Sequence, residues 1–401
     1  MKNLKIFSPQ QKIIANIDRT IELIKGNHPP PVLIEWDLSN SCMHSCFFCL
    51  SAHIHFDKYK NSETFDRSIM QKEKALEIAK DLISIGVRST NFTGGGESTI
   101  SPAFKPVLEY IGQNSDIKMG IFTAGVMLDK FDLFESMCKY MEWIRFSIDS
   151  GTEETYNRIR VTNKNTDWNK MLSNLSKLIE TKKRINSKTV IGTGFVITPD
   201  NYTEIIDFAN MFKNYDVDYC QYKPEIISVE KEGETQRKVE FWETDIKPLL
   251  KQAKEILGDK FQINEYKLND LIDDPIHFGR HYKKCYGSQL TPCIGAQGEI
   301  FVCPNTRGHL KYSYGNVYKR SFIDIWNDVE NRMKVMHLIE EKEKFSGCSA
   351  LCKNHESCKS IWNLKLEYDQ LDSEQKQNWE NNLLNIEMPK ARQETKHWEF
   401  I

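Results

Sequence analysis

The chain has 401 residues, of which 40% are hydrophobic and 27% charged, and its formal net charge is −2. This composition is typical of a globular protein with two or three domains. It gives no electrostatic basis for binding nucleic acid or an acidic membrane surface, and no segment resembles a membrane span or a signal peptide. We therefore expect a cytoplasmic protein, whose eleven cysteines indicate metal binding rather than disulfides.

The predicted elements alternate between helix and strand along the chain. A helix is predicted over residues 8–26, and Pro29-Pro30-Pro31 follows it. The predicted strands are 32–38, 87–93, 117–123, 143–149, 189–197 and 217–224. The predicted helices lie near 71–86, 102–112, 128–139, 152–159, 166–183 and 202–214. Six strand–helix units predict an α/β fold with a parallel sheet and external helices. Barrels of this kind carry their active sites at the C-terminal ends of the strands.

Three cysteines follow the first predicted strand. They lie in the stretch Ser41-Cys42-Met43-His44-Ser45-Cys46-Phe47-Phe48-Cys49-Leu50, with the spacing C-x3-C-x2-C. Three thiolates can hold three corners of a cubic iron–sulfur cluster, which leaves one iron open to a further ligand. The alternatives are a structural zinc site, for which His44 is poorly placed as a fourth ligand, and three unrelated buried thiols.

A glycine-rich turn follows the second predicted strand. Its sequence is Phe92-Thr93-Gly94-Gly95-Gly96-Glu97. Glycines allow a backbone to approach a ligand closely and to adopt positive φ, and Glu97 then presents a carboxylate where the strand ends. A turn of this composition is by itself weak evidence for a site, but its place directly after a strand matches that of the cysteine loop.

Together the two motifs resemble the radical SAM enzymes, which bind a [4Fe–4S] cluster through C-x3-C-x2-C. The resemblance implies that Cys42, Cys46 and Cys49 hold this cluster and that its open iron chelates S-adenosylmethionine (SAM). It also implies that Gly95, Gly96 and Glu97 bind the SAM amino group. Reductive cleavage of SAM in that family gives a 5′-deoxyadenosyl radical, which takes a hydrogen atom from the substrate. The implied fold is a partial (β/α)6 TIM-like barrel, and the implied partner is a flavodoxin- or ferredoxin-type electron donor.

Further contacts with SAM are carried over from the same resemblance. Ser147, in the fourth strand, matches a serine that contacts the SAM ribose. Arg160 matches an arginine that reaches the SAM carboxylate, for which a guanidinium fork is a suitable partner. Phe48 matches an aromatic residue that lies against the adenine. The small residues of the fifth strand, 189–197, suggest room for the edge of the adenine.

Cys220 lies in the sixth predicted strand. Alternate residues of a barrel strand point inward, but the sequence does not fix which of the two sets does. If the thiol points inward, it can donate a hydrogen atom to a substrate radical, and the alternative is a buried structural cysteine. Tyr222 and Lys223, near the end of the same strand, are candidates for contacts with the substrate.

A second group of six cysteines lies near the C-terminus. These are Cys285, Cys293, Cys303, Cys348, Cys352 and Cys358. The spacing from Cys285 to Cys303, with Gln297-Gly298-Glu299 as a hairpin turn, resembles the SPASM and twitch domains of radical SAM enzymes. That resemblance implies one auxiliary [4Fe–4S] cluster, which we expect to be held by Cys285, Cys303, Cys348 and Cys352. Cys293 and Cys358 are alternates, and zinc remains an alternative to iron.

The expected domain organisation follows from these motifs. We expect a helical extension over residues 1–31, the partial barrel over 32–235, a helical linker over 236–284, and a small cysteine-rich α+β auxiliary domain with a C-terminal tail over 285–401. About 31 residues precede the first strand, which is short for an N-terminal peptide-binding domain.

The expected function is therefore that of a radical SAM oxidoreductase or epimerase. Because the segment before the first strand is short, we expect a carbohydrate or other small molecule as the substrate, oxidised by dehydrogenation or epimerised. One alternative is a maturase that crosslinks or epimerises a ribosomally synthesised peptide. An alternative of another class is a non-catalytic iron–sulfur or zinc-binding protein, in which the Gly-Gly-Glu motif would have no purpose.

Overall fold

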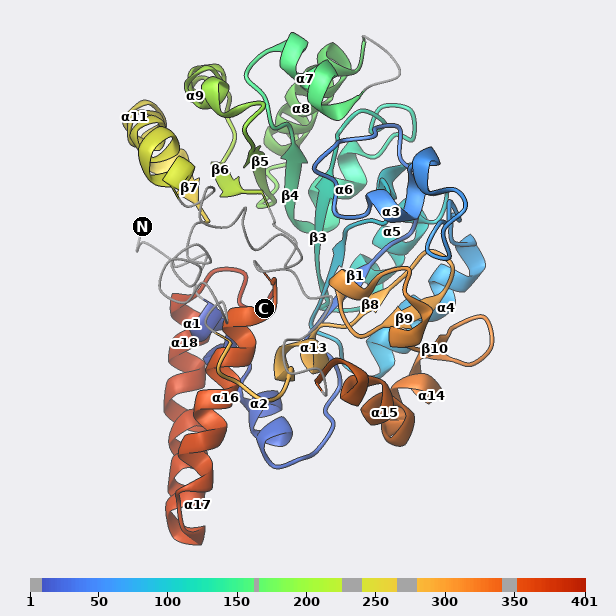
Figure 1. Cartoon of the computed structure of the whole chain (residues 1–401), viewed down its shortest axis with the longest axis vertical. Coiled ribbons are helices and arrows are strands. Elements are labelled where there is room, and N and C mark those ends of the chain that lie inside the picture. Colours follow the sequence, from blue (N-terminus) through green and yellow to red (C-terminus); the bar gives the residue numbers. More distant parts are fainter. Residues whose placement is uncertain (1–8, 162–165, 226–239, 265–279, 341–351) are drawn as a thin grey trace.

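The computed structural model describes residues 9–161, 166–225, 240–264, 280–340 and 352–401 (Figure 1). One ten-stranded sheet runs through them, in the order β10-β9-β8-β1-β2-β3-β4-β5-β6-β7. Its strands are β1 Leu33–Trp36, β2 Ser89–Phe92, β3 Lys118–Thr123, β4 Met141–Ser147, β5 Val190–Ile197, β6 Tyr219–Pro224, β7 Phe261–Ile263, β8 Cys293–Ile294, β9 Glu299–Phe301 and β10 Ser313–Asn316. No described helix is long and apolar enough to cross a membrane.

The α/β class and the six predicted barrel strands are confirmed as β1 to β6, all paired in parallel. The structure adds a strand at each side of this set. β7 pairs in parallel with β6. β8 pairs in parallel with β1, where Glu35 lies opposite Cys293. β9 and β10 then follow in antiparallel pairing, so the cysteine-rich segment extends the barrel sheet. Strands from both sides of the expected domain boundary at residue 285 therefore belong to one sheet.

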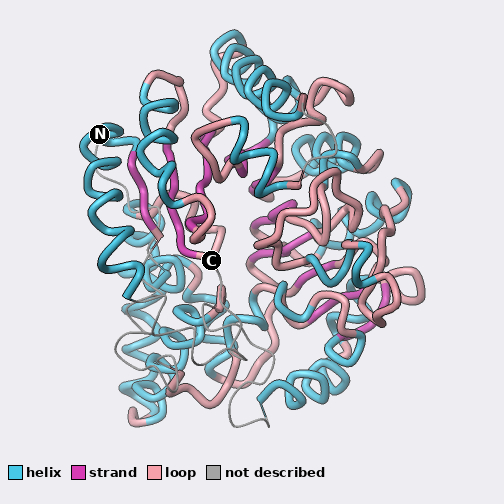
Figure 2. The backbone as a smooth tube through the Cα atoms, turned by 45° about the horizontal axis from the view of Figure 1, so that its top comes forward, coloured by secondary structure: helices cyan, strands magenta, loops and turns pink. Residues whose placement is uncertain are grey.

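The helices lie mainly outside the curved sheet (Figures 1 and 2). Those of the barrel are α3 Ala52–His55, α4 Lys72–Ser84, α5 Phe104–Asn114, α6 Phe134–Tyr140, α7 Glu153–Arg160, α8 Asp167–Arg184, α9 Ile205–Lys213 and α11 Lys247–Leu257, which a π-helical turn, Trp242–Ile246, precedes. The C-terminal segment contributes α13 Tyr286–Leu290, α14 Phe322–Asn327 and α15 Val329–Glu340. The predicted helix over 8–26 consists of two helices, α1 Pro9–Ala15 and α2 Ile17–Ile24.

The two faces of the sheet differ in what they bury. Outward residues such as Ile34, Phe92, Ile144 and Phe146 are fully buried in one large apolar core together with the helices. Because side chains alternate along a strand, their neighbours point into the barrel. A small separate cluster marks this inner face near the strand starts and contains Leu33, Trp143, Val190, Tyr219 and Phe400.

Phe400 in that cluster belongs to the C-terminal tail, which closes the N-terminal end of the barrel. The Phe400 ring lies 5.5 Å from the Trp143 ring. The Ser89 hydroxyl donates to the Glu399 carbonyl (2.5 Å), and the Lys12 ammonium donates to the Phe400 carbonyl (2.6 Å). The last residues of the chain therefore close the bottom of the barrel.

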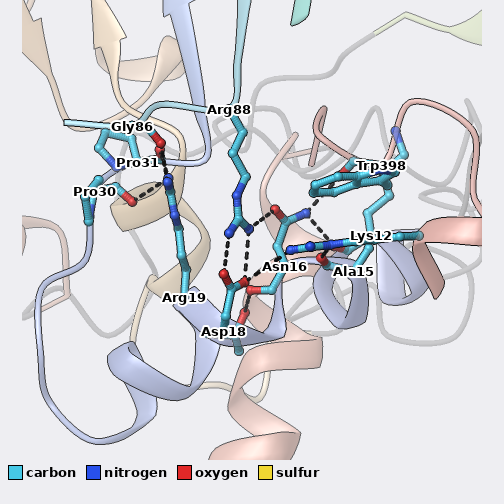
Figure 3. A network of polar contacts seen from close by, with 12 residues as sticks. Lys12, Ala15, Asn16, Asp18, Arg19, Pro30, Pro31, Gly86, Arg88 and Trp398 are labelled. Carbon is cyan, nitrogen blue, oxygen red and sulfur yellow. Dashed lines mark hydrogen bonds and ion pairs between the residues drawn. The ribbon is translucent and has the colours of Figure 1, made fainter. Parts of the chain in front are cut away.

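The tail is anchored by helices from both chain ends. α1 and α2 pack against α16 His355–Asp369, and α1 also contacts α18 Met388–Glu394; α17 Ser373–Asn382 lies beyond them (Figure 1). Figure 3 shows the polar contacts at this point: the Arg88 guanidinium donates to Asn16 (2.7 Å) and to Asp18 (3.0 Å), and the Asn16 amide donates to the Trp398 carbonyl (2.9 Å). The predicted N-terminal helical extension is thus part of the structure that holds the tail.

Candidate active site

The two sequence motifs meet at the C-terminal ends of β1 and β2. The Gly96 amide donates to the Ser39 carbonyl (2.9 Å), and the Glu97 amide donates to the Ser41 carbonyl (2.9 Å). A Cβ added to Gly96 would lie 2.1 Å from the Ser41 carbonyl oxygen, closer than any side chain can approach. The glycines are therefore required for packing against the cysteine loop, a reason that the turn alone did not reveal.

The cysteine loop is also tied to the end of α7. The Ser45 amide donates to the Arg160 carbonyl (3.0 Å) and the Phe47 amide to the Ile159 carbonyl (3.4 Å). Burial raises the pKa of all three thiols, that of Cys49 to about 12, and Cys46 raises the pKa values of Cys42 and Cys49 further by charge repulsion. Three partly buried thiols with these properties form thiolates only beside compensating positive charge, which suits coordination to iron.

Glu97 is buried between the ends of β2 and β3. Its Oε1 accepts hydrogen bonds from the Thr99 amide (3.2 Å), the Thr99 hydroxyl (2.7 Å) and the Thr123 hydroxyl (2.8 Å). Its Oε2 accepts one hydrogen bond, from the Ala124 amide (2.7 Å). The carboxylate is thus held by two loops, and Oε2 keeps more capacity for a further donor such as an ammonium group.

Arg160 lies inside the site, where its guanidinium is largely committed to the protein. It forms an ion pair with Asp149, donates from Nε to the Ile148 carbonyl (3.2 Å), and approaches the Cys46 sulfur through Nη1 (3.7 Å). Asp149 adopts a left-handed backbone conformation, with φ of 64°, which costs energy in a residue other than glycine. In this structure Arg160 therefore faces the cysteine loop and a carboxylate of the protein, and its predicted contact with the SAM carboxylate stays a prediction.

Two other predicted contacts lie at the same end of the barrel. Ser147 is the last residue of β4 and is partly exposed. The partly buried Phe48 lies edge to face with Phe47, 5.4 Å between ring centroids. One of the small residues of β5 has a packing role, because a Cβ on Gly192 would lie 2.2 Å from the Tyr219 ring. Gly192 therefore makes room for an inward side chain of β6, and the expected room for the edge of the adenine along β5 stays a prediction.

Cys220 points out of the barrel, not into it. It is fully buried in the core between sheet and helices, where burial raises its pKa to about 11. Its strand neighbours Tyr219 and Gln221 take the inward positions, since Tyr219 belongs to the inner cluster. Tyr222 also faces outward and donates from its hydroxyl to the Ile205 carbonyl (3.0 Å). This placement removes the reason for assigning Cys220 as a hydrogen-atom donor.

Four of the C-terminal cysteines form a second group. The sulfurs of Cys285 and Cys358 are 3.7 Å apart, and the Gly287 amide donates to the Cys358 sulfur (3.3 Å). Cys352 raises the pKa values of both Cys303 and Cys358 by charge repulsion, so it lies near them. The structure thus groups Cys358, one of the two alternates, with Cys285, Cys303 and Cys352. Cys348 lies outside the described residues. Four buried thiols suit an iron–sulfur cluster. Within the described ranges, no three His, Cys, Asp or Glu side chains are arranged around one metal-ion position.

Cys293 lies apart from this group and connects the C-terminal segment to the barrel. Its sulfur lies 3.9 Å from Asp37 Oδ2. Arg307 pairs with the same carboxylate (2.5 Å) and donates to the Thr93 hydroxyl (2.8 Å). These buried contacts fix the C-terminal segment against the ends of β1 and β2, immediately beside the cysteine and glycine loops.

The sequence interpretation missed the polar residues on the inner face of the barrel. Glu35, Asn91, Arg145 and Gln221 all alternate with outward apolar residues on their strands, and Lys353 from the C-terminal segment pairs with Glu35. A charged residue between Ile144 and Phe146 is the signal that marks Arg145. Counting back two positions from Ser147 would have placed it on the same inner face.

Two family models match the chain. The radical SAM superfamily model matches residues 36–211, and the model of the SPASM iron–sulfur cluster-binding domain matches residues 285–359. The first range begins at the last residue of β1 and spans both motifs and β2 to β5, and the second contains all six C-terminal cysteines.

Similar proteins cover most of the chain. A mycofactocin maturase, MftC of Mycobacterium ulcerans, is 20% identical over 356 residues, which is 86% of either chain. A GTP 3′,8-cyclase of Clostridium perfringens is 25% identical over 227 residues, 55% of this chain and 62% of the relative. Streptococcus suis SuiB, solved in complex with its precursor peptide SuiA, has a TM-score of 0.55 and 17% identity, with 80% of this chain and 70% of SuiB covered. At that identity the likeness to SuiB is a likeness of fold.

Proposed function

We propose that this chain, which is a radical SAM enzyme with a C-terminal SPASM domain, modifies a peptide. Its radical SAM domain implies a [4Fe–4S] cluster that works with SAM, and its SPASM domain implies auxiliary iron–sulfur binding. The observation that carries the proposal is the likeness to MftC, a maturase, over 86% of both chains. A match over 86% of this chain extends beyond the radical SAM range into the C-terminal segment.

Oxidation of a carbohydrate, which the sequence alone favoured, gains no support from the comparisons, and the relative named for a small-molecule substrate, the GTP 3′,8-cyclase, matches only 55% of this chain. The expectation depended on the short segment before β1. SuiB, whose fold this chain shares over 80% of its length, was solved with a precursor peptide. The alternative of a peptide substrate therefore becomes the main proposal, and dehydrogenation, crosslinking and epimerisation remain its possible outcomes.

The proposed roles of the residues follow from their positions. Cys42, Cys46 and Cys49 would hold the catalytic cluster, and when bound it supplies the electron that splits SAM into methionine and the 5′-deoxyadenosyl radical. Oε2 of Glu97 would accept a hydrogen bond from the SAM ammonium. Arg160 would balance the charge at Cys46, to which Nη1 already donates.

The SPASM site is proposed to consist of Cys285, Cys303, Cys352 and Cys358. This set replaces Cys348 of the expected set with Cys358, because Cys358 lies 3.7 Å from Cys285, sulfur to sulfur. Cys293 is left out, since it lies beside Asp37 instead. Iron rather than zinc is proposed for this site because the matching model describes an iron–sulfur domain.

The test compares peptides with sugars as substrates. Anaerobically reconstituted protein is given SAM, a reductant and synthetic peptides encoded by the short reading frames beside its gene, or a panel of monosaccharides and aminocyclitols. We expect 5′-deoxyadenosine in proportion to a peptide product that is two hydrogens lighter, or to an epimer that has unchanged mass when formed in H2O and is one mass unit heavier when formed in D2O. The variant with Cys42, Cys46 and Cys49 all changed to Ala is the control and should form neither product. A modified sugar together with unmodified peptides would contradict the proposal.

A further inference from the structure

Arg145 lies in the middle of the inner face of the barrel. It pairs in register with Phe122 of β3 and Gly192 of β5. Its guanidinium lies 4.1 Å from the centre of the Phe122 ring and donates through Nη1 to the Oε1 atom of Gln221 on β6. The Arg145 guanidinium thus stacks on Phe122 and is hydrogen-bonded to the Gln221 amide, so residues of β3, β4 and β6 together fix its orientation.

Among the described residues no carboxylate lies within ion-pair distance of the Arg145 guanidinium, and Asp149 acts on it only from farther away. No ion pair of Arg145 occurs among the described residues, although the other buried arginines of the site, Arg160 and Arg307, pair with Asp149 and Asp37. Burial lowers the pKa of Arg145, which reflects the cost of a desolvated cation. A charge that is largely withdrawn from water normally has a counter-ion, so an anionic ligand suits this point of the inner face.

Two hydrogen-bond donors beside this charge also lack acceptors. The Nε atom of Arg145 and the Nε2 atom of Gln221 are both buried without a partner in the described part of the chain, and Gln221 is only 1% exposed. Gly194 leaves the space beside Nε unfilled, since a Cβ there would lie 3.4 Å from that atom. Buried donors are normally satisfied. A cation with two donors and no acceptor matches a carboxylate, whose two oxygens accept only.

The inner face around Arg145 is accessible to solvent. Phe122, Arg145 and Ser147 are partly exposed, whereas their outward neighbours Ile144 and Phe146 are fully buried. The C-terminal tail lies at the opposite, N-terminal end of the strands, where Phe400 packs on Trp143. Arg145 precedes Ser147 by two residues, about 7 Å along a strand, so a group bound to Arg145 lies below the strand ends that carry Glu97 and the cysteine loop.

We propose that Arg145 and Gln221 bind a carboxylate group of the substrate and thereby set which substrate atom faces the cluster end. The inference rests on the proposed function only in taking that carboxylate to belong to a peptide, as a terminus or as an acidic side chain. Glu35, on β1 of the same inner face, is already paired with Lys353, so it leaves the Arg145 cation available to a ligand.

Equilibrium dialysis of labelled probes tests the site without requiring turnover. Reconstituted enzyme saturated with SAM is dialysed against N-acetylglycylglycine, N-acetylaspartate α-amide and the neutral N-acetylglycylglycinamide at constant ionic strength. Charged hydrogen bonds contribute enough that we expect carboxylate probes to bind about 10- to 100-fold more tightly than the amide. The tighter of the two carboxylate probes identifies a terminal or a side-chain carboxylate as the natural ligand.

Matched variants locate the binding. Arg145→Met keeps the volume and removes the charge, and it should abolish the preference for carboxylates; Arg145→Lys keeps the charge without the fork and should retain part of it. Gln221→Leu should weaken carboxylate binding severalfold. The exposed Arg184, which pairs with Glu135, provides the control Arg184→Met, which should behave as wild type. Iron content per chain verifies that each variant is folded.

The proposal would be overturned if the wild type bound carboxylate and amide probes equally, or if a folded Arg145→Met variant kept the preference for carboxylates. It would also be overturned if adding SAM abolished probe binding, because the probe would then lie in the SAM site. Failure of the proposed function looks different. A wild type that prefers carboxylates at Arg145 but modifies no peptide retains the site and refutes only the peptide assignment.

Discussion

At the N-terminal end of the barrel the charge of Arg88 is paired within the protein, whereas at the C-terminal end no ion pair of Arg145 occurs among the described residues. Below, Arg88 is bonded to Asn16 and Asp18, and Asn16 in turn holds the tail through Trp398 (Figure 3). Above, Arg145 and Gln221 each keep a donor that no acceptor of the described residues meets. The same strands pass through both ends, so the difference comes from which side chains they place there.

This difference between the two ends indicates that the N-terminal end mainly stabilises the fold and that the C-terminal end mainly binds ligands. An end whose charges are paired and whose side chains are mostly apolar gains stability from burial and offers no unpaired charge to a ligand. Desolvated thiols and unpaired donors lower the free energy of unfolding. A bound ligand or cofactor that supplies their missing partners raises it again. Changes at the bottom should therefore alter folding with little effect on binding, and changes at the top should do the reverse.

The largest expected effect is at the top. Replacing Cys42, Cys46 and Cys49 together by Ala should remove all cleavage of SAM and about half of the iron of the reconstituted protein, because the second cysteine group keeps its own cluster. Iron and sulfide analysis with chromatography of 5′-deoxyadenosine measures both. A triple variant that still forms 5′-deoxyadenosine would contradict the assignment of the catalytic cluster.

The corresponding change at the bottom is Phe400→Ala. Its ring is 7% exposed in the inner apolar cluster, and the loss of a buried Phe costs about 3–5 kcal/mol in free energy of unfolding. Chemical denaturation should show this loss, while folded protein should bind SAM as the wild type does. Ile386→Ala, at a position 58% exposed, is the control and should change stability little. A loss of SAM binding in folded Phe400→Ala would show that the two ends are coupled.

A smaller effect is expected for Glu97→Gln. The amide keeps an acceptor at the position that takes three hydrogen bonds, but it removes the negative charge that we assign to the SAM ammonium. A charged hydrogen bond contributes about 1.5–3 kcal/mol, so the dissociation constant of SAM should rise about 10- to 100-fold, with iron content retained.

Thr123→Val is the matched control for Glu97→Gln, because it removes one hydrogen bond to the carboxylate (2.8 Å) but not the charge. Its effect on SAM affinity should be clearly smaller. Loss of the N-terminal cluster in Glu97→Gln would instead assign Glu97 a structural role.

The smallest expected effect concerns pH at the bottom of the barrel. Burial raises the pKa of Asp18, but the hydrogen bond and charge of Arg88 outweigh it, so the pKa of Asp18 lies below its usual value. A depressed pKa means that the stability from this pair is present above about pH 4 and is lost as the pH falls through the folded-state pKa. Because the Asp18 side chain is 36% exposed, we expect less than about 1 kcal/mol.

The free energy of unfolding of the wild type relative to Asp18→Asn measures that contribution. The difference should be present at pH 7 and should shrink toward pH 3. Asp57→Asn is the control, since the Asp57 side chain is 81% exposed in its pair with Arg67. A difference that grows as the pH falls would contradict the sign of the pKa shift.

Local sequence determined much of the fold and the first half of the site. The six barrel strands were predictable because each combines a short apolar run with turn residues at its ends. Cys42, Cys46 and Cys49 were predictable as a group because they lie in one loop, where proximity follows from the length of the chain. Glu97 followed for a similar reason, since parallel strands end at the same edge of a sheet.

What only the tertiary structure decided are the contacts between distant segments and the direction of side chains. A period of two shows that Cys220 and Gln221 point to opposite faces, but not which one points inward; packing against the helices fixed Cys220 outside. The pairing of β8 with β1, the approach of Cys358 to Cys285 and the insertion of Phe400 join residues at least 73 positions apart. Such contacts depend on how much apolar surface each arrangement buries, a property of the folded whole that no local spacing contains.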